Sequence, residues 1–565
     1  MQKHIKLLRV VFSAALLAGF TFLFLDFSDK VSPVWYRRLL SLEFIPSLDL
    51  FIQSVVHGLA LTAWGWLIVL VLTLLFGRVY CSFLCPLGIL QDVISFASRK
   101  WKFRKRPFRF KYKKPLNWVR YPVLIVGLVS LLFCGTLLVN LLDPYSNFGR
   151  IVSDLLRPLY IRGNNALAGL LEKMGSYALY PIDLIKDNPF TLIIPVIVIV
   201  ALLTLATVRG RIWCNSVCPV GTLLGLVSKV SLFRPVITPD VCNRCTKCLQ
   251  KCKAECINIK AQKVDTTRCV GCFNCVSTCE KGAIRYRLSL PVRNSGKAME
   301  SDPEDMETVS KVAASGLGPM AENVLRSESN GRPQDASRRS FVVQGVTALA
   351  ALTGVSAWAK DESDNGSSDE TEAARQLKME RKTPICPPGS LSLKHFTGAC
   401  TACHLCVSAC PTGVLRPAFL EYGIAGMDQP RMDFNKSFCN QTCTKCGEIC
   451  PTGAILPLTG EKKVTVQIGH VTFVAANCIV SKHETSCGSC AEHCPTKAVR
   501  MVPYKGFLTI PHTDTSLCLG CGACQFACPI PEKNAIFVVS NKEHLTVTPP
   551  EEEVTEYEEQ TEFPF

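Results

Sequence analysis

Cysteines dominate the chemistry that this sequence can perform. The chain of 565 residues contains 31 cysteines, most of them in runs of the form CxxCxxCxxxC. Small disulfide-stapled domains do not show this spacing, whereas bacterial iron–sulfur proteins use it to present four thiolates to a cubane cluster. A zinc ribbon needs pairs of CxxC instead of triplets, which argues against zinc. The cysteines in these runs are therefore predicted to be metal ligands.

The first cysteine-rich region covers residues 236–287 and has the spacing of a bacterial two-cluster ferredoxin. In that arrangement, three cysteines of one run and the last cysteine of the other run bind each cluster. Two features depart from the usual pattern: Lys253 and Glu280 replace the proline after the fourth cysteine, and Cys256 competes with Cys252 as a ligand. The predicted sets are Cys242, Cys245, Cys248 and Cys279 for one 4Fe-4S cluster, and Cys269, Cys272, Cys275 and Cys252 for the other.

Four further runs in the C-terminal part each end in Cys-Pro and together match four 4Fe-4S clusters. The first gap is stretched in the second and third runs, which leaves their pairing open. Strand-like pieces at 464–468 and 535–539 fit a small two-stranded ferredoxin core that occurs twice. The predicted ligands are Cys400, Cys403, Cys406, Cys410, Cys439, Cys443, Cys446, Cys450, Cys478, Cys487, Cys490, Cys494, Cys518, Cys521, Cys524 and Cys528.

An internal repeat supplies two more cysteine pairs: GRVYCSFLCPLG begins at Gly77 and GRIWCNSVCPVG begins at Gly210. Cysteines four residues apart would face one side of a helix, but the proline that follows each pair is equally compatible with a turn. Two loops with buried free cysteines are the simpler alternative. The shared Gly-Arg frame favours a redox role, either one further 4Fe-4S cluster or two dithiols. The predicted cofactor-binding residues are Cys81, Cys85, Cys214 and Cys218.

Four apolar stretches must position these pairs, at residues 5–27, 55–76, 121–142 and 190–208. Each has roughly the 20 residues that a helix needs to cross a bilayer. Eleven Lys and Arg residues lie within 99–120, between the second and third stretch, and predict a cytoplasmic loop by the positive-inside rule. Because the basic residues flank apolar stretches, they indicate a membrane partner and argue against nucleic acid. Both CxxxCP pairs then lie at cytoplasmic ends of helices.

A signal-like stretch at 337–359 contains an arginine pair, an apolar run and an Ala-x-Ala ending. It predicts either a twin-arginine export signal or a fifth membrane segment, although Val342 and Val343 depart from the usual signal. Charge divides at the same place: residues from 360 onward carry 18 basic and 24 acidic side chains, against 44 and 22 before it. Clusters are assembled inside the cell, so a block that carries four of them must be exported already folded.

The chain is thus predicted to be multi-domain, with an α-helical transmembrane bundle and α+β ferredoxin domains of the bacterial type. The expected domains are a four-helix module (1–235), a cytoplasmic two-cluster ferredoxin (236–287), a flexible linker (288–336), the signal-like segment (337–359), a polar tether (360–385), a four-cluster domain (386–548) and an acidic tail (549–565).

The two halves resemble two known families. The four-span part with GRVYCSFLCP, GRIWCNSVCP and its ferredoxin resembles the NapH family of membrane iron–sulfur proteins. The part from Arg338, with SRRSF, CPPGSL and four cysteine runs, resembles the periplasmic NapG family. The resemblance implies a fusion that passes electrons from menaquinol or ubiquinol across the bacterial inner membrane towards a periplasmic reductase.

The leading hypothesis is therefore a membrane-bound relay between the quinone pool and a periplasmic redox partner, a quinol dehydrogenase subunit without catalytic residues or a terminal reductase site of its own. No GxGxxG loop or GxxxxGK loop occurs in the sequence. His57 is a candidate quinone ligand, although packing is the commoner role of a lone membrane histidine. The alternatives are a redox-sensing or maturation protein for a periplasmic metalloenzyme, and a cytoplasmic complex subunit whose C-terminal block stays inside.

Overall fold

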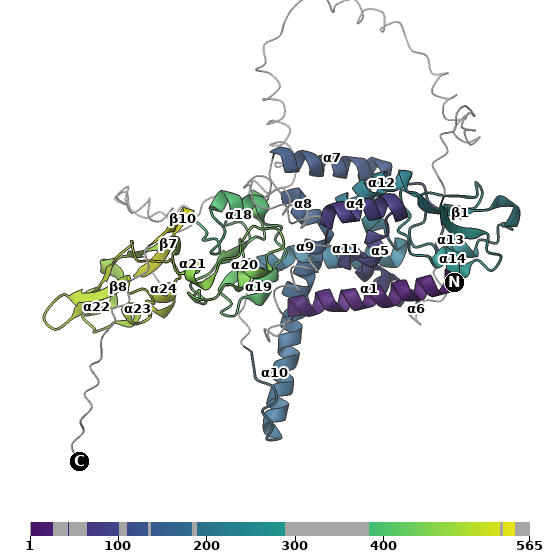
Figure 1. The fold of residues 1–565 in the computed structure, drawn as a ribbon. Helices are drawn as coiled ribbons and strands as arrows, with labels where there is room; N and C mark the ends of the chain where they lie inside the picture. The colour runs from purple at the N-terminus through teal and green to yellow at the C-terminus, as the bar shows by residue number, and fades with distance from the viewer. Residues whose placement is uncertain are drawn as a thin grey trace, which may run out of the picture. The chain divides into compact units, whose positions relative to one another are not determined.

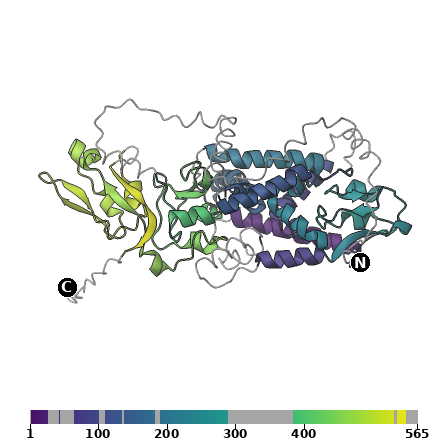
Figure 2. The same cartoon turned by 90° about the horizontal axis from the view of Figure 1, so that it is seen from above.

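The computed structural model describes residues 2–25, 43, 65–100, 110–133, 137–182, 189–288, 383–530 and 535–547. All of them belong to one compact unit, formed by Met1–Pro291 and Gln376–Phe565. Helices make up the first part of this unit, and two-stranded sheets with short helices make up the rest (Figures 1 and 2). The chain is therefore multi-domain and helix-rich. The predicted linker, the signal-like segment, the acidic tail and His57 lie outside the described residues.

Within the described residues, two helical stretches are long and apolar enough to cross a membrane. One is Ile5–Leu25 within α1 (Gln2–Leu25), and the other is Pro189–Arg209, which joins the short helix η2 (Pro189–Leu192) to α11 (Ile193–Arg209). Each has 21 residues, a length of about 30 Å, which matches the hydrocarbon core of a bilayer. A buried core helix and a signal sequence satisfy the same two criteria. The four-span bundle therefore stays a prediction.

The other two predicted spans are described in part. The second is seen as α4 (Gly65–Phe76), because the residues before Gly65 lie outside the described ranges. The third is represented by α7 (Asn117–Phe133) and α8 (Leu137–Leu142), and residues 134–136 between them are likewise not described.

The two Gly-Arg repeats have the same local fold. After α4 and α11 the chain turns at Gly77 and Gly210, both with positive φ, and enters a short helix, α5 (Tyr80–Phe83) or η3 (Trp213–Val217). A longer helix then starts at the proline of each motif, α6 (Pro86–Lys100) or α12 (Pro219–Val227). Proline is favoured at a helix start because its missing N–H has no partner there. Each cysteine pair therefore spans a helix–helix break and does not lie on one helix face.

The segment between the third and fourth predicted spans is helical over residues 144–173. It contains α9 (Pro144–Arg150), the π-helix η1 (Ile151–Leu156) and α10 (Arg157–Lys173), which follow one another without interruption. The Asp143 side chain caps this segment by accepting a hydrogen bond from the Ser146 N–H at 2.7 Å, next to Pro144 at the first helical position. The search for continuous apolar stretches did not identify this helical segment, because polar residues interrupt its hydrophobic residues.

The first ferredoxin region is built from two small sheets. Strand β1 (Phe233–Ile237) pairs antiparallel with β4 (Ile284–Leu288), and β2 (Ile257–Asn258) pairs with β3 (Lys263–Val264). The helices α13 (Lys247–Lys251) and α14 (Asn274–Thr278) each lie just before the last cysteine of a run. The sheets thus bring the two runs together.

The C-terminal region contains three two-stranded sheets of the same kind among its described residues. Strand β5 (Leu415–Pro417) pairs with β6 (Pro430–Met432), β8 (Val499–Pro503) with β9 (Thr509–Thr513), and β7 (Val466–Phe473) with β10 (Ile536–Thr546). The strand-like pieces predicted at 464–468 and 535–539 overlap β7 and β10. Short helices precede the last cysteine of each run: α19 (Leu405–Ala409), α20 (Lys445–Ile449), α23 (Ser489–Glu492) and α24 (Ala523–Ala527).

Replacing Gly210 by alanine tests the turn after α11. The residue has φ of +64°, and a Cβ there would lie 2.6 Å from the Lys253 carbonyl oxygen. The substitution should therefore destabilise the protein by about 1–3 kcal/mol, measured as a lower apparent Tm of the purified chain. Gly169→Ala in α10 is the matched control, since no atom lies within 4 Å of its Cβ position. Equal apparent Tm values for the Gly210→Ala and Gly169→Ala variants would contradict the assignment of a tight, positive-φ turn to Gly210.

Candidate functional site

Cavities lined by thiols recur along the ferredoxin regions. In each of three C-terminal cavities, three cysteines of one run meet the last cysteine of a second run. The first run therefore pairs with the second, and the third with the fourth, which answers the question that the stretched spacing left open. The three sets are Cys400, Cys403, Cys406 and Cys450; Cys439, Cys443, Cys446 and Cys410; and Cys478, Cys487, Cys490 and Cys528.

Two further sets follow from electrostatic neighbours. Burial raises the pKa of Cys248 to about 11, and the nearby Cys279 and Cys245 thiols add to that shift. Burial likewise raises the pKa of Cys521 to about 12, with Cys518 and Cys494 as neighbours. These neighbours correspond to the predicted set around Cys242 and to a fourth C-terminal set around Cys518.

A fourth cavity, in the first ferredoxin region, holds five thiols. Cys252, Cys269, Cys272 and Cys275 line it, in agreement with the predicted second set. Cys256 lines the same cavity and is buried. Both Cys252 and Cys256 are therefore close enough to the same cavity to serve as its fourth ligand.

The donor chemistry of these sets fits cubane clusters. Backbone N–H groups point at cysteine sulfurs, as Ala402 does to Cys400 at 3.4 Å and Gly520 to Cys518 at 3.3 Å. Such hydrogen bonds stabilise thiolate sulfur, and iron supplies the positive charge that buried thiolates need. Within the described ranges, no three His, Cys, Asp or Glu side chains are grouped to hold a single ion. A cubane takes its four thiolates around a volume, one to each iron.

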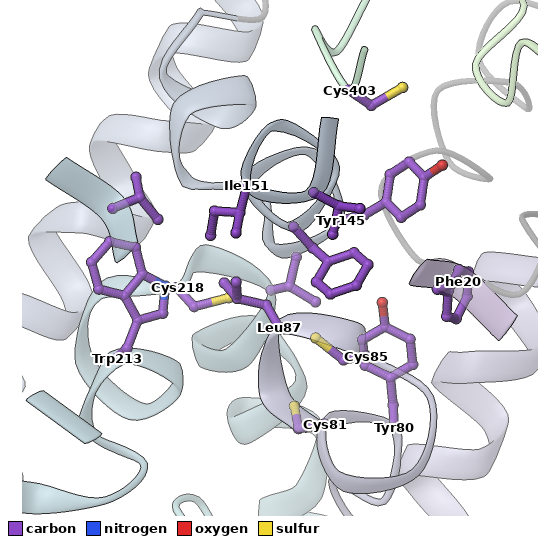
Figure 3. Close-up of a cluster of buried hydrophobic side chains, with 14 of the residues drawn as sticks. Phe20, Tyr80, Cys81, Cys85, Leu87, Tyr145, Ile151, Trp213, Cys218 and Cys403 are labelled. Atoms are coloured by element: carbon purple, nitrogen blue, oxygen red, sulfur yellow. The ribbon is translucent and has the colours of Figure 1, made fainter. Parts of the chain in front are cut away.

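The CxxxCP thiols form one buried group in the helical part. Cys85 interacts electrostatically with Cys81, Cys214 and Cys218, and all four are at most 3% exposed. Figure 3 shows Cys81, Cys85 and Cys218 in the same cluster, with Tyr145 on the side towards Cys403. The two repeats thus bring their cysteines together, as a shared redox centre requires.

Arg78 and Arg211, the arginines of the two Gly-Arg repeats, connect the two cysteine loops by hydrogen bonds. The Arg78 Nη2 donates to the Cys214 carbonyl oxygen at 2.9 Å, and Arg211 Nη1 donates to the Cys81 carbonyl oxygen. Each arginine therefore holds the cysteine loop of the other repeat. Gln91 adds a contact from its Nε2 to the Cys214 sulfur at 3.3 Å. The Gly-Arg repeat could be recognised from the sequence, but the binding of each arginine to the cysteine loop of the other repeat could not.

Asp92 connects three parts of the chain through buried ion pairs. Its carboxylate contacts Arg211 at 2.8 Å, Arg9 of α1 at 3.1 Å and Lys253 of the ferredoxin region at 3.1 Å. Burial by itself would raise the pKa of Asp92, but these three cations hold it well below its usual range. Lys253, which stands where a proline is usual, therefore ties the ferredoxin loop to the helices.

The first C-terminal run packs against α8, α9 and η1. Arg150 pairs with Asp428 at 3.3 Å, both fully buried, and donates to the Ala402 carbonyl oxygen at 2.9 Å. His404 Nδ1 lies 2.9 Å from an Asp154 carboxylate oxygen. Burial would lower the pKa of His404, but Asp154 raises it to about 9, while burial raises the pKa of Asp154 itself. Asn140 adds a hydrogen bond to the Cys400 carbonyl oxygen at 2.8 Å.

Other polar contacts had no signal in the sequence. Lys463 donates to the Cys439 sulfur at 3.4 Å and to the Cys443 carbonyl oxygen. Cys386 is buried with its sulfur 3.3 Å from His544 Nε2 and lines none of the four thiol cavities, although it packs in the same hydrophobic cluster as Cys400 and Cys406. Cys134 lies outside the described residues.

Paired cysteine runs on small two-stranded folds define a ferredoxin-type 4Fe-4S electron-transfer protein. A family model described as a 4Fe-4S binding domain matches residues 59–104 and 189–237, which contain both CxxxCP motifs. A second, described as a 4Fe-4S dicluster domain, matches residues 399–454 and 485–530 and so supports the pairing of the C-terminal runs.

Similar curated proteins carry names of the same kind. The methylamine utilization ferredoxin-type protein MauM of Methylophilus methylotrophus is 35% identical over 163 residues, 26% of this chain and 66% of MauM. The ferredoxin-type protein NapF of Escherichia coli K12 is 27% identical over 26% of this chain and 80% of NapF. The putative electron transport protein YccM of the same strain is 26% identical over 40% of this chain and 55% of YccM.

The first of these relatives are thus matched over slightly less than two thirds of their length. No solved structure matches the chain. The comparisons bear out an iron–sulfur electron-transfer protein, and the particular NapH–NapG fusion stays a prediction.

Asp92→Asn tests the ionic connection. It would leave Arg9, Arg211 and Lys253 buried without their counter-charge, and breaking a buried pair costs about 3–5 kcal/mol. We expect a much lower apparent Tm and faster proteolysis between the helical part and the ferredoxin region. Glu280→Gln is the control, because its pair with Lys247 is exposed and should contribute nothing measurable. Similar losses in both variants would contradict a special role for Asp92.

Proposed function

We propose that this chain is a membrane-bound electron relay between the quinone pool and a periplasmic redox partner. Six thiol sets hold 4Fe-4S clusters in this proposal, two in the ferredoxin region and four in the C-terminal block. Cys81, Cys85, Cys214 and Cys218 hold a further redox centre. Clusters, when bound, accept and donate single electrons, and the terminal reductase is another protein.

One observation carries the proposal: a single buried core contains thiols of all three regions. Cys272 of the ferredoxin region, Cys85 of the CxxxCP group and Cys403 of the C-terminal block pack into the same hydrophobic cluster. Phe148 belongs to it as well, and so does Tyr145, which Figure 3 labels. Redox groups in one dry, packed core are well arranged for electron transfer between them.

The contacts of helix α1 support a transmembrane arrangement of the two ferredoxin regions. Arg9 near its start pairs with Asp92, beside the ferredoxin loop, whereas Phe24 near its end packs against Phe148 next to the C-terminal block. The two positions are separated by about 22 Å along a helix of 1.5 Å rise. The two ferredoxin regions therefore meet the helices at different levels, as a transmembrane relay requires.

Exposed apolar side chains support a membrane environment. Leu8 of α1, Ile125 of α7 and Ile197 of α11 are 71%, 58% and 62% exposed, and neighbours on the same helices are also exposed. Apolar surface of this extent is costly in water and marks contact with lipid or protein. The proposal puts the C-terminal block in the periplasm, and it relies for this on the signal-like segment 337–359.

Quinol reduction of the full chain tests the relay. The protein is reconstituted in liposomes and menaquinol is added anaerobically, with cluster bleaching followed by stopped-flow absorbance and the reduced clusters identified by EPR. We expect rapid reduction that extends to the C-terminal clusters. The Cys85→Ser variant should slow reduction of those clusters by at least tenfold, because it removes a member of the central thiol group.

Cys386→Ser is the control for loss of a buried cysteine outside the six sets. Failure of menaquinol to reduce any cluster of the intact protein would overturn the quinol relay and favour the sensing or maturation role. Unchanged transfer in Cys85→Ser would remove the CxxxCP group from the route.

A reporter fused after Lys382 tests the location of the C-terminal block. We expect activity of a reporter that works only in the periplasm, such as an alkaline phosphatase, and no activity of a cytoplasmic one. The reverse result would put both ferredoxin regions on one side of the membrane and contradict a transmembrane relay.

A further inference from the structure

Cys256 is a fifth thiol in a cavity that needs four. It lies four residues after Cys252, the last cysteine of its run. At the same distance from the last cysteine, the four other runs in which this position is described have a small apolar residue that is at most 2% exposed. In the sixth run the position is Glu532, which lies outside the described residues. These residues are Ala283, Val414, Ala454 and Ala498. The position is therefore an ordinary core position, and in this run alone among the five it carries sulfur.

The cavity assigns different roles to Cys252 and Cys256. Cys410, Cys450 and Cys528 hold the same place in their runs as Cys252, and each lines a cavity with three cysteines of the partner run. Cys252 also accepts hydrogen bonds from the backbone N–H groups that follow it. It therefore has the position and the environment of a ligand, and Cys256 is left as the additional thiol.

The contacts of Cys256 are with ligand sulfurs. Its Sγ lies 3.5 Å from the Cys252 Sγ, and it also hydrogen-bonds with Cys269. Its side chain is 2% exposed, so water does not compete for these bonds. A thiol has one proton to donate, whereas thiolate ligands only accept.

We propose that the Cys256 thiol donates its one S–H hydrogen bond to a ligand sulfur, that of Cys252 or Cys269, and so raises the reduction potential of this one cluster. Hydrogen bonds to ligand sulfurs favour the reduced, more negative cluster. The inference rests on the proposed function only in that it requires a cluster at this cavity.

The cavity that contains Cys256 lies beside the helical part of the chain. A Cβ on Gly271 would lie 3.0 Å from a methyl group of Val79, beside the first CxxxCP motif, and Cys272 packs against the core that contains those thiols. The set around Cys242 has no such thiol donor. Cys256 therefore raises the potential of the inner cluster relative to the outer one and favours an electron on the side of the helices.

Substitution of Cys256 in the full-length protein separates the roles of donor and ligand. Cys256→Ala should fold, because alanine occupies this position in three other runs. We expect unchanged iron content and a shift of one cluster midpoint to more negative potential in an EPR-monitored redox titration. Cys256→Ser keeps a donor and should restore part of the shift. An exchangeable proton coupled to that cluster in ENDOR spectra should disappear in Cys256→Ala.

The converse variant is Ala283→Cys, which introduces a thiol at the equivalent position beside the outer set. It should shift the outer cluster midpoint to more positive potential, and Val414 shows that this position accepts a larger side chain. Loss of about four irons per chain in Cys256→Ala would make Cys256 a ligand and overturn the proposal. Unchanged cluster midpoint potentials in Cys256→Ala and Ala283→Cys would also overturn the proposal. A wild-type protein without a cluster at this cavity would instead contradict the proposed function.

Discussion

The ion pairs of Asp92 are the interaction on which the helical part and the first ferredoxin region both depend. One carboxylate faces Arg9, Arg211 and Lys253 in a buried site, so the site retains excess positive charge. Buried cations are costly unless they are compensated, and Asp92 alone does not compensate three. In the proposed function, thiolates bound to iron would complete the balance, because Cys81 and Cys214 lie beside Arg211 and Cys272 lies beside Lys253. The charges that join the parts thus also favour negatively charged redox centres next to them.

The exchanged arginines explain how two separate repeats make one centre. If Arg78 and Arg211 bound their own loops, each motif would be complete alone, and nothing would fix one pair of cysteines against the other. Because each arginine binds the opposite loop, neither loop is satisfied until both repeats have assembled. Gly88 and Gly221 allow this approach, since a Cβ at either position would collide with a cysteine carbonyl oxygen. The glycines that follow the two CxxxCP motifs are therefore required by packing.

Local spacing was enough to predict the ligand chemistry, and long-range packing was not predictable from it. The CxxCxxCxxxC runs, the two-cluster assignment around Cys269 and the strand pieces of β7 and β10 follow from patterns within a few residues. The helix after Asp143 was missed because its polar and apolar residues form no simple run, and Asp154 acquires its role from His404, which lies far away in the sequence. Lys253 was noticed as a departure from the ferredoxin pattern, but its purpose depends on Asp92.

The contacts of the C-terminal block arrange its thiol sets in an order. The set with Cys403 packs against the helices, and it shares its two runs with the set around Cys439. The Cys439 N–H donates to the Cys521 carbonyl oxygen at 2.9 Å, which connects this second set to the one around Cys518. That set in turn shares its runs with the set around Cys478. Because each step joins neighbouring sets through a shared run or a backbone hydrogen bond, the series has two distinct ends. In the proposed relay, a redox partner that exchanges electrons with the whole series would therefore dock at the Cys478 end, opposite to the end that contacts the helices.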